Sequence, residues 1–169
     1  MSKRHSLSLA LGAALVACVT VSEDPRVTAK EPDRESFPQV ADLLARRCGS
    51  LDCHGTRARN LRIFSGQGLR LAATDRPTSH ANSTTAAEYD EDFLSVVGLE
   101  PELLGDVVSH GGAQPERLTL VRKARNAEHH KGEMLVREGD DADHCITSWL
   151  AGGTDVSSCT NATAAFPFP

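Results

Sequence analysis

The sequence lacks most of the features that would assign its function directly. The longest apolar run in its 169 residues is residues 7–17, whereas a helix needs about 20 apolar residues to cross a bilayer. It contains no G-x-S-x-G motif, no H-E-x-x-H motif and no clear pair of acidic residues, which argues against a hydrolase. An excess of positive charge is also absent, because 18 basic residues stand against 23 acidic ones. We therefore expect no nucleic-acid partner, since phosphate backbones attract basic surfaces.

The N-terminus has the pattern of an export signal. Lys3 and Arg4 precede the apolar run, which ends in Leu-Val-Ala-Cys at residues 15–18. This tetrapeptide matches the bacterial lipobox, in which the chain is cut before the cysteine and the cysteine is acylated. We therefore predict a signal peptide at 1–17 and a lipid-bearing Cys18, which would hold the protein on membrane lipid without a spanning helix. The alternative is an ordinary signal peptide in which the cysteine is incidental.

Export would place the mature chain in the oxidising bacterial cell envelope. The residue after Cys18 is Val19, not the aspartate associated with inner-membrane retention. This favours the outer membrane, with the protein facing the periplasm or the cell exterior. Loss of residues 1–17 removes two basic and no acidic side chains, so the formal net charge changes from −5 to −7.

The remaining chain divides into a tether, one folded domain and a tail. Residues 18–35 are charged, contain two prolines and show no apolar period, which is typical of a flexible tether. Residues 36–159 form one domain by this division, and residues 160–169 are expected to be a disordered tail. Apolar stripes predict helices that start near Ser36, Thr85, Pro101, Pro115 and Asp140. These starts are marked by first-turn prolines, by acidic residues and by two predicted capping boxes, Ser36 with Gln39 and Thr85 with Glu88.

One segment breaks this helical pattern. Residues 60–71 alternate between polar and apolar side chains around a glycine-rich turn, which predicts a short β-hairpin. Residues 72–85 are polar and are expected to form a surface loop. The fold class is therefore mainly α, with a short hairpin inserted.

Residues 48–55, Cys-Gly-Ser-Leu-Asp-Cys-His-Gly, carry the chemistry of the chain. Two thiols followed at once by an imidazole are typical of covalent haem attachment, whose usual form is C-x-x-C-H. Both cysteines then form thioethers and the histidine ligates the iron. Here four residues separate the cysteines in place of two. We predict one haem c held by Cys48, Cys53 and His54, with Gly55 allowing a close approach of backbone and porphyrin.

The cysteines leave other interpretations open. Cys48 and Cys53 also fit a plain disulfide, with His54 as a surface residue. A zinc site with a fourth ligand is a further alternative, which an oxidising compartment disfavours. We expect Cys145 and Cys159 to form a disulfide, and the cysteine count fits either one disulfide plus haem or two disulfides.

The second axial ligand should lie well downstream of His54. Met134 is the only methionine besides the initiator, and it precedes the last predicted helix, where a cytochrome methionine ligand would lie. The competing ligand is His130, with His129 and His110 behind it. We favour His130 over Met134. The choice sets the potential, because a thioether favours reduced iron and raises the potential, whereas two imidazoles lower it. A five-coordinate iron would instead bind small ligands or support peroxidase-like chemistry.

The chain resembles a loose group of bacterial haem lipoproteins with a cytochrome c-like domain. In that group a histidine–glycine segment precedes a C-terminal helix that contains tryptophan. The resemblance covers residues 48–55, 130–132 and 146–152, and Glu133 stands where the family has a second glycine. It implies that Trp149 packs beside the macrocycle.

The function implied by this resemblance is electron transfer. The protein would pass single electrons between redox partner proteins at the membrane surface, as a carrier more than as a catalyst. The alternative is a haem-free structural or interaction lipoprotein that two disulfides hold together.

Overall fold

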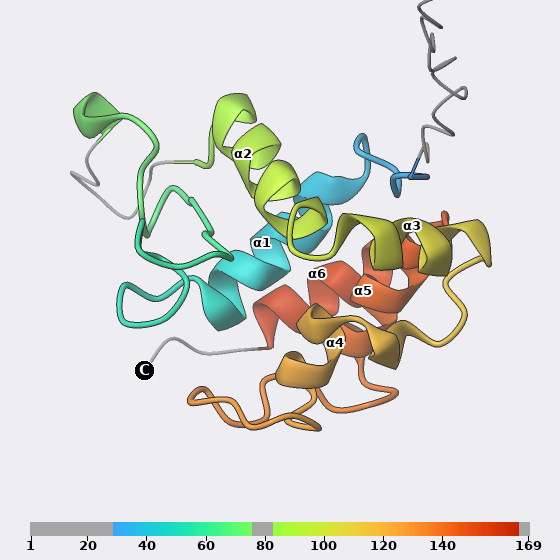
Figure 1. The fold of residues 1–169 in the computed structure, drawn as a ribbon. Coiled ribbons are helices and arrows are strands. Elements are labelled where there is room, and N and C mark those ends of the chain that lie inside the picture. The colour runs from blue at the N-terminus through green and yellow to red at the C-terminus, as the bar shows by residue number, and fades with distance from the viewer. Residues whose placement is uncertain (1–28, 76–82, 166–169) are drawn as a thin grey trace, which may run out of the picture.

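The computed structural model describes residues 29–75 and 83–165, which Figure 1 draws in colour. Within these residues the chain is mainly helical, with six α-helices, two short 3-10 helices and one isolated β-bridge. This confirms the predicted fold class at the level of mainly α. The predicted signal peptide at 1–17 and Cys18 lie outside the described residues. None of the helices in the described ranges has the length and apolar character needed to cross a membrane.

Most helices begin where the sequence predicts. The α-helices are α1 (Phe37–Cys48), α2 (Ala86–Val97), α3 (Pro101–Ser109), α4 (Thr119–Ala124), α5 (Asp141–Leu150) and α6 (Val156–Ala164). The 3-10 helices are η1 (Ala73–Asp75) and η2 (Pro115–Arg117). The helix predicted from Pro115 is divided into η2 and α4, because Leu118 between them has an extended backbone.

The two predicted capping boxes have different outcomes. At the start of α2, Thr85 Oγ1 accepts the Glu88 N–H at 3.3 Å, and the Glu88 carboxylate accepts the Thr85 N–H at 2.9 Å. At the start of α1, the Ser36 side chain makes no capping bond, so the predicted box with Gln39 is wrong. Its hydroxyl lies 2.7 Å from that of Thr154, and a tertiary contact has replaced the local one.

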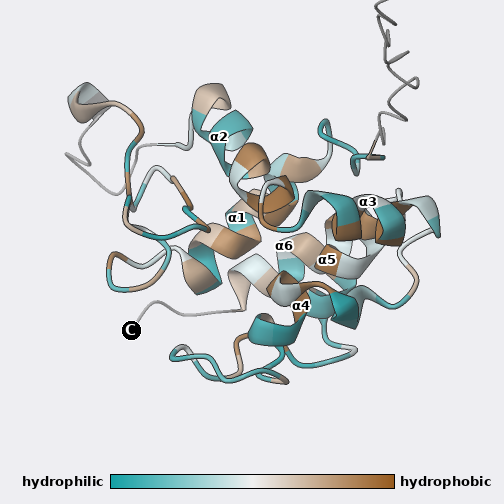
Figure 2. Cartoon of the chain, viewed as in Figure 1, coloured by the Kyte–Doolittle hydropathy of each residue, from teal (hydrophilic) through white to brown (hydrophobic). Residues whose placement is uncertain are grey.

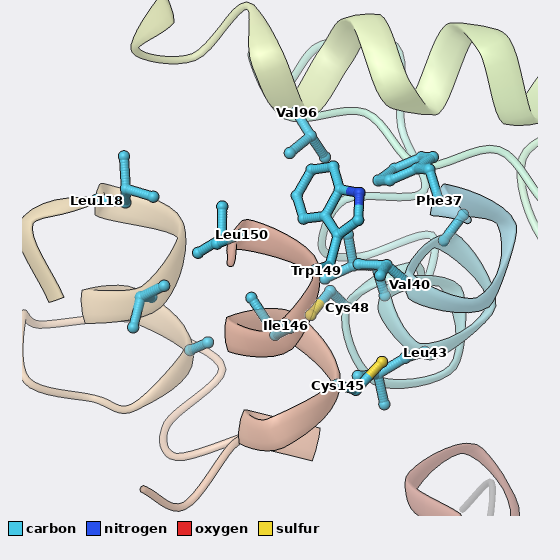
Figure 3. Packing of buried hydrophobic residues seen from close by; sticks show 14 of the residues in the cluster. Phe37, Val40, Leu43, Cys48, Val96, Leu118, Cys145, Ile146, Trp149 and Leu150 are labelled. Atoms are coloured by element: carbon cyan, nitrogen blue, oxygen red, sulfur yellow. The ribbon is translucent and has the colours of Figure 1, made fainter. Parts of the chain in front are cut away.

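Helix α1 lies at the centre of the arrangement and packs against α2, α5 and α6 (Figure 1). Each of these helices contributes buried residues to one hydrophobic core, and Figure 2 colours the most hydrophobic positions of the chain brown. Trp149 of α5 is fully buried, and its ring centroid lies 5.1 Å from that of Phe37 on α1 (Figure 3). The Trp149 indole N–H donates to the Asp33 carbonyl at 2.7 Å. Trp149 therefore connects α5 with α1 through Phe37, and with the chain before α1 through Asp33.

The folded region starts before residue 36. Besides the bond from Trp149, Asp33 accepts the N–H groups of Glu35 and Ser36. A Cβ atom at Gly105 of α3 would lie 3.0 Å from the Ala29 Cβ, so the chain near Ala29 packs closely on α3. The tether predicted for 18–35 is therefore wrong for residues 29–35, because a buried tryptophan and a small residue on α3 hold them.

Helix α6 replaces part of the predicted tail. The disulfide Cys145–Cys159 is present and links α5 to α6, which also packs on α1. The Asp155 side chain caps α6 by accepting the Ser158 N–H at 3.0 Å, and Ala162 is buried. Residues 160–164 are thus helical, and the prediction of a disordered tail is wrong for them.

Residues 60–71 do not form the predicted hairpin, since the described part of this segment has one parallel bridge at Phe64 and no strand. Side chains of α2 bind its backbone donors. The Arg62 N–H donates to Ser95 Oγ at 2.7 Å, and the Phe64 N–H donates to Asp92 Oδ1 at 2.7 Å. Ser95 and Asp92 accept the N–H groups that a neighbouring strand would otherwise accept. A segment with alternating polar and apolar residues can therefore be extended without pairing with a second strand.

We expect loss of the disulfide to destabilise the domain. Cys145 and Cys159 are 14 residues apart and fully buried, and closing a loop of this length stabilises a fold by about 3 kcal/mol on the chain-entropy model. Cys145→Ser should therefore lower the free energy of unfolding by about that amount in a urea titration. A reducing agent should shift the wild-type midpoint and leave that of the variant unchanged. Equal midpoints for the two proteins would contradict the prediction.

Candidate functional site

A mostly apolar cavity of ≈ 360 Å³ lies where the chain after α1 meets α4 and the segment that follows α4. This volume lies within the range of small-molecule and cofactor sites. Its walls include four leucines, the Cys48 thiol, two imidazoles and two cations; these are Leu61, Leu99, Leu120, Leu135, His54, His130, Arg59 and Lys123. A second cavity of ≈ 350 Å³ lies beside Asp42 and Tyr89 and contains none of the residues predicted to hold a cofactor.

The Cys-His stretch forms a tight loop at the end of α1. Cys48 is the last residue of α1, and its carbonyl accepts the His54 N–H at 3.0 Å. The Ser50 carbonyl accepts the N–H groups of Cys53 and Gly55, both at 2.9 Å. A Cβ atom at Gly55 would lie 2.3 Å from the Gly49 carbonyl oxygen, so only glycine fits there. The sequence predicts that Gly55 allows the backbone close to a porphyrin. In the structure it lets the backbone pass close to Gly49 and Ser50, and the four residues between the cysteines fold into one compact turn.

The His54 ring is oriented by a backbone bond. Its Nδ1 lies 3.0 Å from the Leu61 carbonyl oxygen, which can only accept, so Nδ1 carries the proton. This leaves the Nε2 lone pair free, which is the arrangement found in metal-ligating histidines. Burial lowers the pKa of His54, the charges of His130 and Arg59 lower it further, and the bond to Leu61 opposes them. At neutral pH the ring is therefore uncharged, as a metal ligand must be.

The second imidazole of the cavity belongs to His130. The ring centroids of His54 and His130 are 6.0 Å apart and their planes differ by 21°. His130 Nδ1 is buried and has no hydrogen-bond partner among the described residues. The cavity thus brings together two near-parallel imidazoles, each with a ring nitrogen that could bind a metal.

The protein supplies few further metal ligands around this pair. The described part of the chain has no cluster of three or more histidine, cysteine or acidic side chains that could hold a metal ion. A structural zinc site needs four protein ligands, whereas haem iron takes four nitrogens from its own ring and at most two from the protein. Two facing imidazoles in an apolar cavity therefore suit haem better than zinc.

Cys48 and Cys53 are free thiols in this structure. Cys48 is buried and lines the cavity, whereas Cys53 is half-buried and lies outside the lining. Burial raises the pKa of the Cys48 thiol to about 12, with a smaller effect from Cys53. A thiol with this pKa is inert as a nucleophile, since the thiolate is the reactive form. The structure thus brings Cys48, His54 and His130 together and leaves Cys53 at the edge of the site.

The segment that carries His130 is held in place from α1 and α4. The N–H groups of Leu135 and Val136 both donate to the Ala124 carbonyl at 3.0 Å, and Arg47 Nη1 donates to the Leu135 carbonyl at 2.5 Å. Arg47 directly precedes Cys48, so it connects the attachment loop with the chain that follows His130. No sequence pattern identifies Arg47 as part of the site, because a basic residue in the last turn of a helix is usually explained by the helix dipole.

Comparison with protein-family models, with curated proteins and with solved structures finds no match for this chain. The function therefore has to be inferred from the geometry of the site.

The other residues predicted for the site lie elsewhere. Met134 is 55% exposed, His129 is exposed, and neither lines the cavity. His110 is exposed at the end of α3, where its Nδ1 lies 2.8 Å from the Asp106 carbonyl oxygen. Trp149 packs in the core against Phe37, and it is not part of the cavity lining either.

Glu133 has the backbone conformation that glycine adopts most easily. Its φ is +57°, in the left-handed region that residues other than glycine rarely adopt. A side chain in this region costs about 1 kcal/mol relative to glycine. Glu133→Gly should therefore stabilise the fold by up to about 1 kcal/mol in a urea titration, less the entropy that glycine adds to the unfolded chain. Glu138→Gly, at a neighbouring position without a positive φ, should not stabilise it.

Proposed function

We propose that this protein is a lipid-anchored monohaem c-type cytochrome-like carrier of single electrons. The observation that carries the proposal is the pair of imidazoles, His54 and His130, 6.0 Å apart in an apolar cavity that also contains the Cys48 thiol. A cytochrome c-like domain is supported by α1, which ends at the first attachment cysteine and packs against α5. The anchor is supported by the sequence around Cys18.

The chain's own residues would bind, orient and insulate the cofactor. When bound, the haem supplies the one-electron chemistry. His54 and His130 would ligate its iron, and the leucine walls of the cavity would exclude water. Two imidazoles favour a lower potential than an imidazole with a thioether. Arg59 and Lys123, which also line the cavity, suit the negative carboxylates at the edge of a haem.

The burial of Cys48 constrains the order of assembly. Cys48 and Cys53 would hold the haem through thioether bonds. The folded structure buries the Cys48 thiol and raises its pKa to about 12, which makes it unreactive once α1 has packed. Cys48 would therefore have to be joined to the cofactor before the domain has folded completely.

Haem staining of a denaturing gel tests the proposal, because a thioether-bound haem stays on the denatured chain. The exported protein should give a stained band, and its intact mass should include one haem and the acyl groups on Cys18. Cys48→Ser/Cys53→Ser should abolish staining. Cys145→Ser/Cys159→Ser is the matched control, because it removes two cysteines outside the site and should leave the haem in place. A colourless protein with Cys48 joined to Cys53 would reject the proposal and favour the haem-free lipoprotein.

A further inference from the structure

Asp92 of α2 is a buried carboxyl group without an ion-pair partner in the described part of the chain. It is 0% exposed, Oδ1 accepts the Phe64 N–H at 2.7 Å, and Oδ2 is buried without a hydrogen-bond partner among the described residues. One turn earlier, Glu88 is equally buried, and the Arg70 guanidinium binds both of its oxygens at 2.8 and 3.0 Å. The nearby cation is thus committed to Glu88. A buried carboxylate without a counter-ion is costly, so Asp92 favours its protonated form.

A short extended segment connects Asp92 with the candidate axial ligand His54. The segment is residues 61–64. Two of its residues bind α2, since the Arg62 N–H donates to Ser95 Oγ and the Phe64 N–H donates to Asp92. The other two, Leu61 and Ile63, bind His54. The Leu61 carbonyl lies 3.0 Å from the His54 Nδ1, and the Ile63 N–H donates to the His54 carbonyl at 2.9 Å. The segment is therefore in contact with Asp92 on one side and with His54 on the other.

The charges that face Asp92 come from three elements. Glu88 and Glu91 on α2 and Asp42 on α1 are negative, and the segment after Phe64 contributes Arg70, which is paired with Glu88. Burial raises the pKa of Asp92 to about 8, the Phe64 N–H opposes this, and the carboxylates of Glu88, Asp42 and Glu91 raise it further. Asp92 therefore exchanges its proton near pH 8 and is mostly protonated below it.

We propose that Asp92 is a redox-linked proton site, which at mildly alkaline pH takes up a proton from solvent when the haem site accepts an electron. The inference rests on the proposed function. The electron comes from the redox partner, the proton comes from water, and one negative and one positive charge enter together, so the net charge of the protein is unchanged. An added negative charge stabilises the protonated carboxyl group, and by reciprocity the proton stabilises the reduced state. The protein would then move a proton with its electron, in addition to serving as a carrier.

The midpoint potential of the haem-loaded protein, recorded as a function of pH, tests this coupling. Reduction raises the pKa of Asp92, so the wild-type potential should fall as pH rises through about 8, by up to about 59 mV per pH unit. Asp92→Asn should give a potential that is independent of pH across the same range. Asp90→Asn is the matched control, because Asp90 lies on the same helix but is exposed, and it should keep the wild-type slope.

An infrared difference spectrum between the reduced and oxidised wild type provides a second readout. Reduction should increase the absorption of a protonated carboxyl group, which can be seen in the wild type alone. The absence of this band in Asp92→Asn would assign it to Asp92. A wild-type potential that does not change with pH, a slope that survives in Asp92→Asn, or the absence of the carboxyl band would each overturn the coupling and leave the carrier function intact. A chain without haem would overturn the proposed function together with the coupling.

Discussion

If the protein carries haem as proposed, replacing His130 by alanine is expected to convert it from six-coordinate to five-coordinate, whereas replacing Met134 by leucine is expected to leave the coordination unchanged. The His130 ring lies 6.0 Å from that of His54 and lines the same cavity, and its Nδ1 has no partner among the described residues. Met134, four residues later, is 55% exposed. A thioether in solvent would have to enter the cavity and displace an imidazole that is already there. The visible spectrum of the loaded protein distinguishes the two variants.

Carbon monoxide binding gives a second measurement of the same change. The reduced wild type should not bind carbon monoxide readily, because both axial positions are taken, and His130→Ala should bind it at the position that the imidazole leaves. His129→Ala is the matched control, since His129 is the exposed neighbour of His130 and should behave like the wild type. A spectral change in Met134→Leu with none in His130→Ala would assign the sixth position to methionine and contradict the prediction.

Local signals account for the parts of the structure that the sequence predicts well. Thr85 and Glu88 cap α2 through bonds within one turn, and Pro101 starts α3 with a ring that fits the first helical position. His54 follows Cys48 so closely in the chain that a tight turn had to keep them near each other. That His130 lies opposite His54 is a long-range result. The sequence favoured this residue by resemblance alone, and the geometry of the cavity provides an independent reason for it.

The errors arise where distant residues supply the hydrogen bonds. The alternation of residues 60–71 predicts a hairpin. The hydrogen-bond partners of Arg62 and Phe64 are instead Ser95 and Asp92 on α2, which lie 33 and 28 residues further along the chain. Residues 160–164 have little apolar character, yet the disulfide at Cys159 and the contact of α6 with α1 keep them helical. Such partners cannot be identified from periodicity, because periodicity reports only what one segment can bury.

Arg70→Met is expected to cause the largest loss of stability among the variants considered. Glu88 is 0% exposed and accepts bonds from the Arg70 guanidinium, from the Leu71 N–H and from Thr85. Burial raises the pKa of Glu88, but the bonds from Thr85, Leu71 and Arg70 outweigh it and lower the pKa below its usual 4.5. The variant would leave this carboxylate buried without its cation, which costs about 3–5 kcal/mol. Urea unfolding at pH 7 measures the loss.

The pH dependence and two further variants separate this effect from a general loss of packing. Because the pKa of Glu88 is lowered on folding, the pair stabilises the protein above about pH 4.5, and this stability is lost as pH falls through the lowered value. Arg70→Met should therefore lie closest to the wild type in acid. Arg117→Met breaks the exposed pair with Asp106 and should cost no more than about 1 kcal/mol. Arg70→Met/Glu88→Gln removes both charges but keeps an amide oxygen that can accept a backbone N–H, so it should recover much of the loss; a double variant as unstable as Arg70→Met would show that the uncompensated charge is not its cause.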